Sequence, residues 1–301
     1  MRQPDGAEHD HLDVDDHDAA GRDLLDDLDD QGPPLGWVPV RTYLDDILAR
    51  HRRAAAADDR DVARLQEEAA AVGGTRDFAA ALRAPGLAVI AEIKRRSPSK
   101  GDLGMARPPG EMAAAYATGG AACLSVLTDA ESFGGSAADL AEAREAVALP
   151  VLRKDFTVCA ADVCDARLMG ADAVLLIAAA LSDAELASLG GLARRLGMAA
   201  LYEVHDEDEV ARVLAAGAEV VGVNQRDLHT FAVDTSRAVR VAAAIPDSVV
   251  KVAESGIAGP GDAGALADAG FDAVLVGESL VRSPDPAAAV AALGAVPVRA
   301  R

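Results

Sequence analysis

Eight short apolar runs recur between residues 87 and 277, and their spacing constrains the fold more than any other feature of the chain. Alanine-rich segments with helical periodicity separate the runs, which indicates alternating strands and helices. The runs lie near residues 87–93, 121–127, 150–154, 172–178, 199–204, 219–224, 250–254 and 272–277. Eight alternations within about 210 residues predict an α/β fold, the (β/α)8 or TIM barrel.

A recurring phrase supports this fold class. Gly120, Gly170, Gly217 and Gly270 each stand one or two residues before a run, where a glycine in the left-handed conformation can end a helix. The stretch Ser182-Asp183-Ala184-Glu185 is a capping box that should begin the helix after the fourth run. A doubly wound sheet is the alternative, but it normally carries a glycine-rich dinucleotide-binding turn after its first strand, and no such turn follows the first run.

Two different segments precede the first run. Residues 1–36 are acidic and nearly without aromatic side chains, which predicts a disordered tail. Residues 37–86 show helical periodicity near 43–48, 59–71 and 78–82, and the basic run 50–53 is expected at the C-terminal end of the first helix, where it would favour the helix dipole. We therefore expect a single TIM-barrel domain over residues 37–301 that includes N-terminal helices (37–86).

Composition and charge exclude several functional classes. The net charge of −20 opposes binding to nucleic-acid phosphates, and half of it lies in residues 1–32, with twelve acidic residues against two arginines. No apolar run approaches the roughly 18 residues needed to span a membrane, and the N-terminus does not resemble a signal peptide. Cys123, Cys159 and Cys164 suit neither a disulfide framework nor a zinc site. A cytoplasmic protein is expected.

Charged or polar side chains end six of the eight runs, at the rim where active sites of TIM barrels lie. They are Glu92, Lys94, Lys154, Asp155, Glu203, Asn224, Arg226, Glu254, Ser255, Gly277 and Glu278, counting the glycine that precedes Glu278. The barrel histidines, His205 and His229, lie in loops, so a histidine-centred triad or metal site is poorly supported. Lysines with carboxylates suit acid–base catalysis or a Schiff base. The alternative for Glu92 and Lys94 is a structural ion pair.

Two further features narrow the chemistry. A lysine near other cations or in an apolar site has a lowered pKa, which suits a proton donor. The stretches 253–257 and 276–279 end the last two runs with small residues, and loops at these places form the phosphate site of many TIM barrels. Ser97 and the basic loop after the first run could close this site. The alternative is that the glycines serve only the turn conformation.

The stretch Glu92-Ile93-Lys94-Arg95-Arg96-Ser97-Pro98-Ser99-Lys100-Gly101 closely resembles the signature of the indole-3-glycerol-phosphate synthase family. The resemblance extends over residues 43–290. Further matching motifs lie, in the family's order, at 122–128, 133–136, 152–156, 202–205, 222–228 and 253–257. Two features depart from the family pattern: Gln225 replaces a residue that is usually smaller, and the acidic tail is additional.

This resemblance implies a lyase that converts 1-(2-carboxyphenylamino)-1-deoxyribulose 5-phosphate to indole-3-glycerol phosphate, carbon dioxide and water in tryptophan biosynthesis. It implies that Lys154 is the general acid, that Glu203 is the base of the dehydration, and that Lys94 binds the substrate carboxylate. Glu92 and Asn224 would hold hydroxyl groups and support proton transfer. The remaining expected substrate-binding residues are Phe133, Phe156 and Leu176 at the aromatic ring, Ser97, Ser255, Gly256, Gly277 and Glu278 at the phosphate, and Glu254 and Arg226, the latter without a defined role.

No cofactor or metal is expected, because the substrate carries its own carbonyl group and ring nitrogen. The expected partner is a small phosphorylated substrate, with no nucleic acid and no membrane. The working hypothesis for assembly is a monomer, with weak association with other tryptophan-pathway enzymes left open. Two alternative functions are a sugar-phosphate isomerase on the same barrel and a non-catalytic paralogue that acts through its acidic tail.

Overall fold

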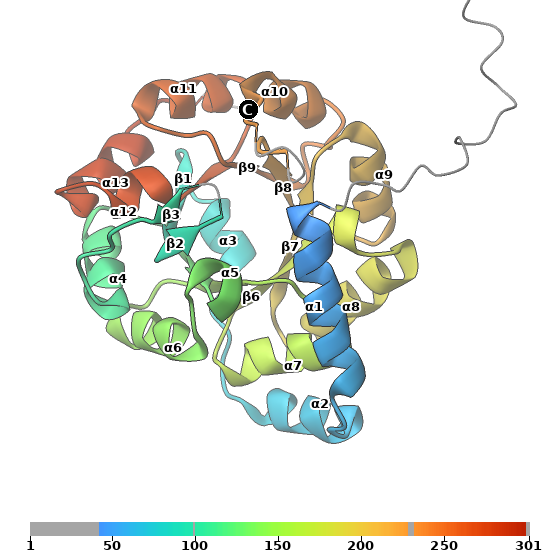
Figure 1. Ribbon diagram of the computed structural model, residues 1–301. Helices are drawn as coiled ribbons and strands as arrows, with labels where there is room; N and C mark the ends of the chain where they lie inside the picture. The colour runs from blue at the N-terminus through green and yellow to red at the C-terminus, as the bar shows by residue number, and fades with distance from the viewer. Residues whose placement is uncertain (1–41, 99, 228–231, 299–301) are drawn as a thin grey trace, which may run out of the picture. The chain divides into compact units, whose positions relative to one another are not determined.

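The computed structural model describes residues 42–98, 100–227 and 232–298, which contain a closed barrel of eight parallel strands (Figure 1). Neighbouring strands follow the order β1-β10-β9-β8-β7-β6-β5-β4. Their bounds are β1 Ala88–Ile93, β4 Cys123–Leu127, β5 Val151–Lys154, β6 Ala173–Ile177, β7 Ala199–Val204, β8 Val220–Asn224, β9 Val250–Glu254 and β10 Ala273–Val276. Each strand lies within one of the eight apolar runs, so the predicted TIM barrel is confirmed.

Helices surround the strands, as Figure 1 shows. The longer ones are α4 Pro109–Thr118, α6 Ala137–Ala146, α7 Ala160–Leu168, α8 Asp183–Arg195, α9 Glu207–Ala215, α10 Thr235–Ala242, α11 Pro260–Asp268 and α13 Pro286–Gly294, and short α5 Ala130–Phe133, η1 Ala178–Ala180 and α12 Glu278–Val281 lie between them. The predicted capping box at Ser182 begins α8. The four recurring glycines have φ angles between 83° and 92°, the left-handed conformation predicted for them.

Buried side chains form two clusters because successive residues of a strand face opposite sides of the sheet. One cluster fills the barrel interior and includes Ile90, Leu152 and Leu201. The larger one lies between the strands and the surrounding helices and includes Val89, Leu124 and Tyr202. This alternation decides which residues of each strand reach the interior, and hence the open end of the barrel.

Three helices precede the barrel: α1 Tyr43–Ala57, α2 Val62–Ala71 and α3 Phe78–Leu82. The side chains of Phe78 and Leu82 belong to the interior cluster and contact it from α3. The prediction that residues 50–53 end the first helix was wrong, because α1 continues to Ala57 and has no basic residue in its last turn. Four consecutive alanines follow the basic run, and alanine has the highest helix propensity.

The basic loop after β1 also differs from expectation. It contains a short antiparallel hairpin of β2 Arg96–Ser97 and β3 Gly101–Asp102. Gly101, with φ of 66°, permits the chain to reverse between these strands. The predicted disordered tail, residues 1–36, lies outside the described residues. Within the described ranges, the helices are too short or too polar to cross a membrane.

Candidate active site

A cavity of about 530 Å³ opens at the carboxyl ends of the barrel strands, within the range usual for small-molecule sites. Its lining contains every predicted site residue except Leu176. The predicted residues that line it are Glu92, Lys94, Ser97, Phe133, Lys154, Phe156, Glu203, Asn224, Arg226, Glu254, Ser255, Gly256, Gly277 and Glu278. The structure therefore brings together side chains that lie up to 186 positions apart in the sequence, from Glu92 to Glu278.

Leu176 requires a correction. Its side chain is fully buried in the cluster between the strands and the helices, so it does not line the cavity. Its neighbours Leu175 and Ile177 belong to the interior cluster and line the cavity instead. The physical reason is the alternation along β6: Ile177 pairs with Glu203, which faces the cavity, whereas Leu176 pairs with Tyr202, which faces the helices.

Lys154, at the end of β5, lies at the centre of the charged groups in the cavity. Its ammonium Nζ is 2.7 Å from Glu203 Oε2 at the end of β7 and 3.0 Å from Glu254 Oε2 at the end of β9. Asn224 Nδ2 donates a hydrogen bond of 3.0 Å to the other oxygen of Glu203. Both carboxylates are about 2% exposed, and the Lys154 side chain is 14% exposed, so one half-buried lysine is shared by two buried acids.

Burial and charge oppose each other in this group. Burial alone would lower the pKa of Lys154, but Glu203, Glu254 and then Glu92 raise it above its ordinary value. The expectation of a lowered lysine pKa was therefore wrong, because the neighbouring charges are carboxylates rather than cations. Lys154 is an ammonium in the free protein.

The two acids differ in protonation. Burial alone would raise the pKa of Glu203, but Lys154, His205 and Asn224 hold it below its usual range, so Glu203 is ionised. Burial is also the largest effect at Glu254, and the charge of Glu203 adds to it; together they outweigh the attraction of Lys154 and raise the pKa of Glu254 to about 7. One lysine cannot stabilise two buried carboxylates equally, so a proton is shared near neutral pH.

Glu92 near the end of β1 and Lys94 just after it form an ion pair of 2.6 Å. Ser125 Oγ of β4 donates a hydrogen bond of 3.3 Å to the other Glu92 oxygen. The space for this carboxylate depends on Gly277, because a side chain there would collide with Glu92 Oε1. Gly222 of β8 provides the same clearance for Glu254 Oε1.

Small residues after β9 and β10 form one end of the cavity. Ser255 has φ of 66°, the one positive φ among the non-glycine residues that the structure describes, and Gly256 follows with φ of 71°. Such strained backbone is frequent at ligand sites. The first N–H groups of α12 begin directly after Gly277 and have no partner within a helix. Ser97 Oγ is buried and finds no hydrogen-bond partner within the described ranges. These N–H and O–H groups can donate hydrogen bonds to an anion.

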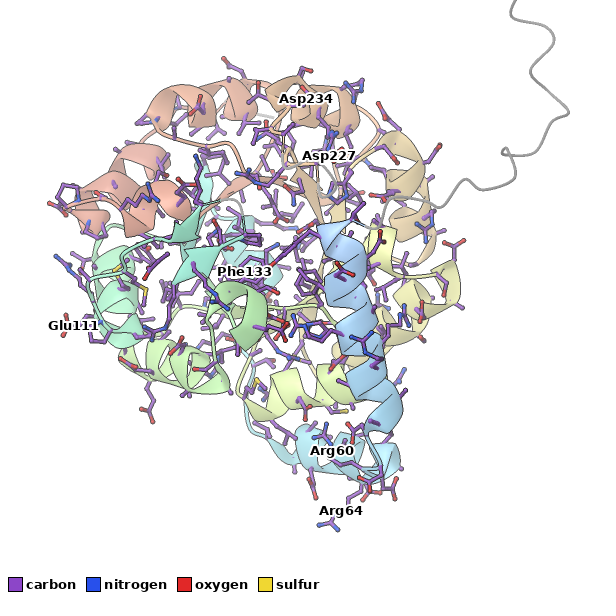
Figure 2. All side chains as sticks on the ribbon, viewed as in Figure 1. Arg60, Arg64, Glu111, Phe133, Asp227 and Asp234 are labelled. Carbon is purple, nitrogen blue, oxygen red and sulfur yellow. The ribbon has the colours of Figure 1, made fainter. Side chains whose placement is uncertain are left out.

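Aromatic and apolar side chains form the other end. Phe133 ends α5, toward the centre of the barrel in Figure 2, and its ring centroid lies 6.3 Å from that of Phe156. Tyr43, Leu44 and Ile47 of α1 complete this part of the lining. Our sequence reasoning missed these three residues. Their helical spacing is visible in the sequence, but a local pattern does not reveal that the helix crosses the ends of the strands.

His205, after β7, is a second omission. Its Nε2 is buried, lies 3.9 Å from Glu203 Oε1 and has no hydrogen-bond partner in the described part of the chain. Burial alone would lower the pKa of His205, but Glu209 and Glu203 raise it. The motif Tyr202-Glu203-Val204-His205 held the signal, whereas the loop position of His205 argues only against a histidine-centred triad or metal site.

Comparisons with known proteins show the family to which the chain belongs. The family model of indole-3-glycerol phosphate synthase matches residues 44–293. Over 234 residues the chain is 54% identical to indole-3-glycerol phosphate synthase 2 of Streptomyces coelicolor, which covers 78% of this chain and 91% of that protein. It is 51% identical over 251 residues to the indole-3-glycerol phosphate synthase of a Nocardioides species, with 83% and 96% covered.

Solved structures support the fold alone. Thiamine phosphate pyrophosphorylase from Pyrococcus furiosus superimposes with a TM-score of 0.53 at 15% identity, covering 70% of this chain and 95% of that one. The fold does not decide the chemistry. The family match does, and both the predicted family and the predicted class of enzyme are confirmed: this chain belongs to the indole-3-glycerol phosphate synthase family, the carboxy-lyases of that step in tryptophan biosynthesis.

Proposed function

We propose that the cavity residues carry out ring closure, decarboxylation and dehydration with Lys154 as the acid and Glu203 as the base. The chain has indole-3-glycerol phosphate synthase activity in tryptophan biosynthesis and binds a phosphorylated substrate. The observation that carries our assignment of roles is the contact of Lys154 with both Glu203 and Glu254 inside the cavity.

The lining suggests how 1-(2-carboxyphenylamino)-1-deoxyribulose 5-phosphate is oriented. Its phosphate binds the N–H groups and hydroxyls around Ser255, Gly256, Gly277 and Glu278, with Ser97 closing the site. Its aromatic ring lies against Phe133, Phe156, Leu175 and Ile177 together with α1. The ring carboxylate pairs with Lys94, which exchanges part of its contact with Glu92 for the substrate.

The acid–base steps follow from the charges. Lys154 donates a proton to the ribulose carbonyl oxygen as the aromatic carbon attacks the carbonyl carbon. Loss of carbon dioxide then restores the conjugation of the ring. In the dehydration the hydroxyl group leaves as water with a second proton from Lys154, and Glu203, ionised in the free protein, accepts the proton that the neighbouring carbon loses. Glu254, with a pKa of about 7, can return a proton to Lys154 across their 3.0 Å contact. Glu92 and Asn224 hold the hydroxyl groups, and Arg226 binds substrate at the rim.

A steady-state assay tests this proposal. Purified chain is mixed with the carboxyphenylamino sugar phosphate, and indole absorbance is followed; the substrate of the preceding sugar-phosphate isomerisation is assayed in parallel. Turnover of the first substrate alone is expected, with Lys154→Ala as the matched inactive control. Turnover by Lys154→Ala at the wild-type rate would contradict the assignment of roles.

Assembly is a separate proposal. We retain the monomer predicted from the sequence, since the proposed site is complete within one chain. Size-exclusion chromatography with light scattering distinguishes a mass near 30.8 kDa from multiples of it.

A further inference from the structure

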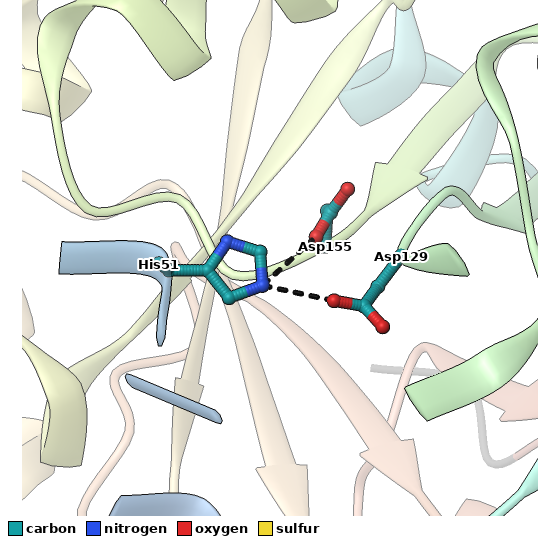
Figure 3. Close-up of side chains that lie close together, drawn as sticks. All are labelled: His51, Asp129 and Asp155. Atoms are coloured by element: carbon teal, nitrogen blue, oxygen red, sulfur yellow. Dashed lines mark hydrogen bonds and ion pairs between the residues drawn. The ribbon is translucent and has the colours of Figure 1, made fainter. Parts of the chain in front are cut away.

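His51 lies in the middle of α1 and contacts two buried carboxylates of the barrel (Figure 3). Its ring nitrogen Nε2 is 2.9 Å from Asp129 Oδ2 and 3.9 Å from Asp155 Oδ1. Asp129 follows β4 and Asp155 follows β5, so one imidazole joins the N-terminal helix to two loops at the rim. The two aspartate side chains are 1% and 4% exposed, and that of His51 is 17% exposed.

Each aspartate also fixes a segment that carries a phenylalanine of the cavity. Asp129 Oδ1 accepts a hydrogen bond of 2.6 Å from the Ser132 N–H and thereby caps α5, whose last residue is Phe133. Asp155 Oδ1 accepts one of 2.8 Å from the Phe156 N–H. The His51 ring itself lies 5.3 Å from the Phe156 ring, centroid to centroid. His51 therefore contacts the supports of both aromatic residues.

The same face of α1 reaches the cavity. Tyr43, Ile47 and His51 are spaced by four residues, which places them along one side of the helix. Tyr43 and Ile47 line the cavity, and His51 binds the rim one turn further on. The contact with the rim and part of the cavity wall therefore lie on one side of the same helix.

The three ligand-type side chains could suggest a metal site, since their donor atoms lie within 4.8 Å of one another. The charges argue against it. Arg50 Nη2 is 2.7 Å from Asp129 Oδ2, and Arg153 Nη2 is 2.9 Å from Asp155 Oδ2, so each carboxylate already pairs with a guanidinium. A divalent cation would be placed beside two positive charges in a buried site. The arrangement suits a polar contact that holds His51 to the two aspartates rather than a metal centre.

We propose that His51 is a positioning residue that holds α1 against the loops after β4 and β5 and so sets the width of the aromatic end of the substrate site. This inference rests on the proposed function in one respect, that the substrate's ring occupies this end. The aromatic end of the cavity contacts the substrate's ring equally in the ground state and in the transition state. Its loss should therefore raise KM and leave kcat nearly unchanged.

The test compares His51→Ala with His51→Gln and with Arg53→Ala. Gln retains an N–H donor at a similar reach but loses the ring contact with Phe156. Arg53 is an exposed residue of the same helix and serves as the matched control. Kinetics give kcat and KM, and calorimetry measures the binding of 2-aminobenzoate, which probes the aromatic end, and of inorganic phosphate, which probes the other end.

We expect His51→Ala to raise KM and weaken 2-aminobenzoate binding about tenfold, with phosphate binding and kcat within about twofold of wild type. His51→Gln should lie between, and Arg53→Ala should match wild type. Unchanged 2-aminobenzoate binding in both His51 variants, or equal weakening of phosphate binding, would overturn the proposal. So would a stoichiometric metal in the wild type that is lost in His51→Ala. A wild type that binds 2-aminobenzoate but does not turn over the sugar phosphate would refute the proposed function instead.

Discussion

The ammonium of Lys154 donates a hydrogen bond of 2.7 Å to the carboxylate of Glu203, so the proposed acid and the proposed base are each other's partners before substrate binds. This ion pair keeps Lys154 protonated, as the proposed ring closure requires, and Glu203 ionised, as the proposed dehydration requires. It also means that substrate must enter between two groups that already attract one another.

Replacing Glu203 by glutamine should abolish most turnover while the protein still folds. Gln keeps the size of the side chain and can accept the hydrogen bond from Asn224, but it cannot accept a proton. We expect kcat to fall at least about a hundredfold and phosphate affinity, measured by calorimetry, to remain. Near wild-type turnover would move the base to Glu92, and a variant that does not fold would support a purely structural ion pair with Lys154.

Glu254 should make stability depend on pH. Its pKa rises from 4.5 in the unfolded chain to about 7 in the folded one, so the folded state binds this proton more tightly. This group therefore stabilises the fold fully below about pH 4.5, and the contribution is lost as pH rises to about 7. Glu254→Gln removes this pH dependence. The Tm of the variant minus the Tm of wild type should therefore be more positive at pH 8 than at pH 5. A Tm difference that is constant between these pH values would refute the raised pKa.

The two neighbours on β6 should behave differently. Leu176→Ala removes a side chain buried against the helices and should cost about 2–5 kcal/mol of unfolding free energy without changing KM. Ile177→Ala shortens a cavity residue and should raise KM at a smaller cost in stability. Chemical denaturation and steady-state kinetics measure both quantities. A rise in KM confined to Leu176→Ala would restore the original prediction for this residue.

Residues 1–36 remain a prediction from composition alone. An acidic segment with few apolar side chains has little surface to bury, so its removal should leave kcat and Tm nearly unchanged. Kinetics and thermal unfolding of the full chain and of the chain from residue 37 test this. A Tm lowered by more than about 4 °C would show that the segment contributes to the folded barrel.

Local periodicity predicted the barrel because each barrel strand lies within an apolar run, and because signals such as the capping box at Ser182 and the four recurring glycines mark helix ends. It also predicted which residues end the strands. The placement of Leu176 at the aromatic ring came from the family resemblance, and it was wrong by one residue. Periodicity could not correct it, because a fully apolar strand such as β6 gives no sign of which face looks inward.

Contacts between residues far apart in the sequence could not be predicted from local patterns either. Nothing near residue 51 indicates that His51 meets Asp129 and Asp155, because the pairing depends on how α1 crosses the barrel rim. The direction of the pKa shift of Lys154 was predicted wrongly because it depends on which charges lie nearby in space. The two carboxylates that decide it come from strands 49 and 100 residues away in the sequence.

The kinetics of Lys154→Ala, measured beside Lys94→Ala, test the central claim most directly. A proton donor acts in the transition state, whereas a lysine that pairs with the substrate carboxylate binds ground state and transition state alike. We predict that Lys154→Ala lowers kcat by about 10²–10⁴-fold with little change in KM, and that Lys94→Ala mainly raises KM. If Lys154→Ala changes only KM, Lys154 is not the acid, and the account of this site is wrong.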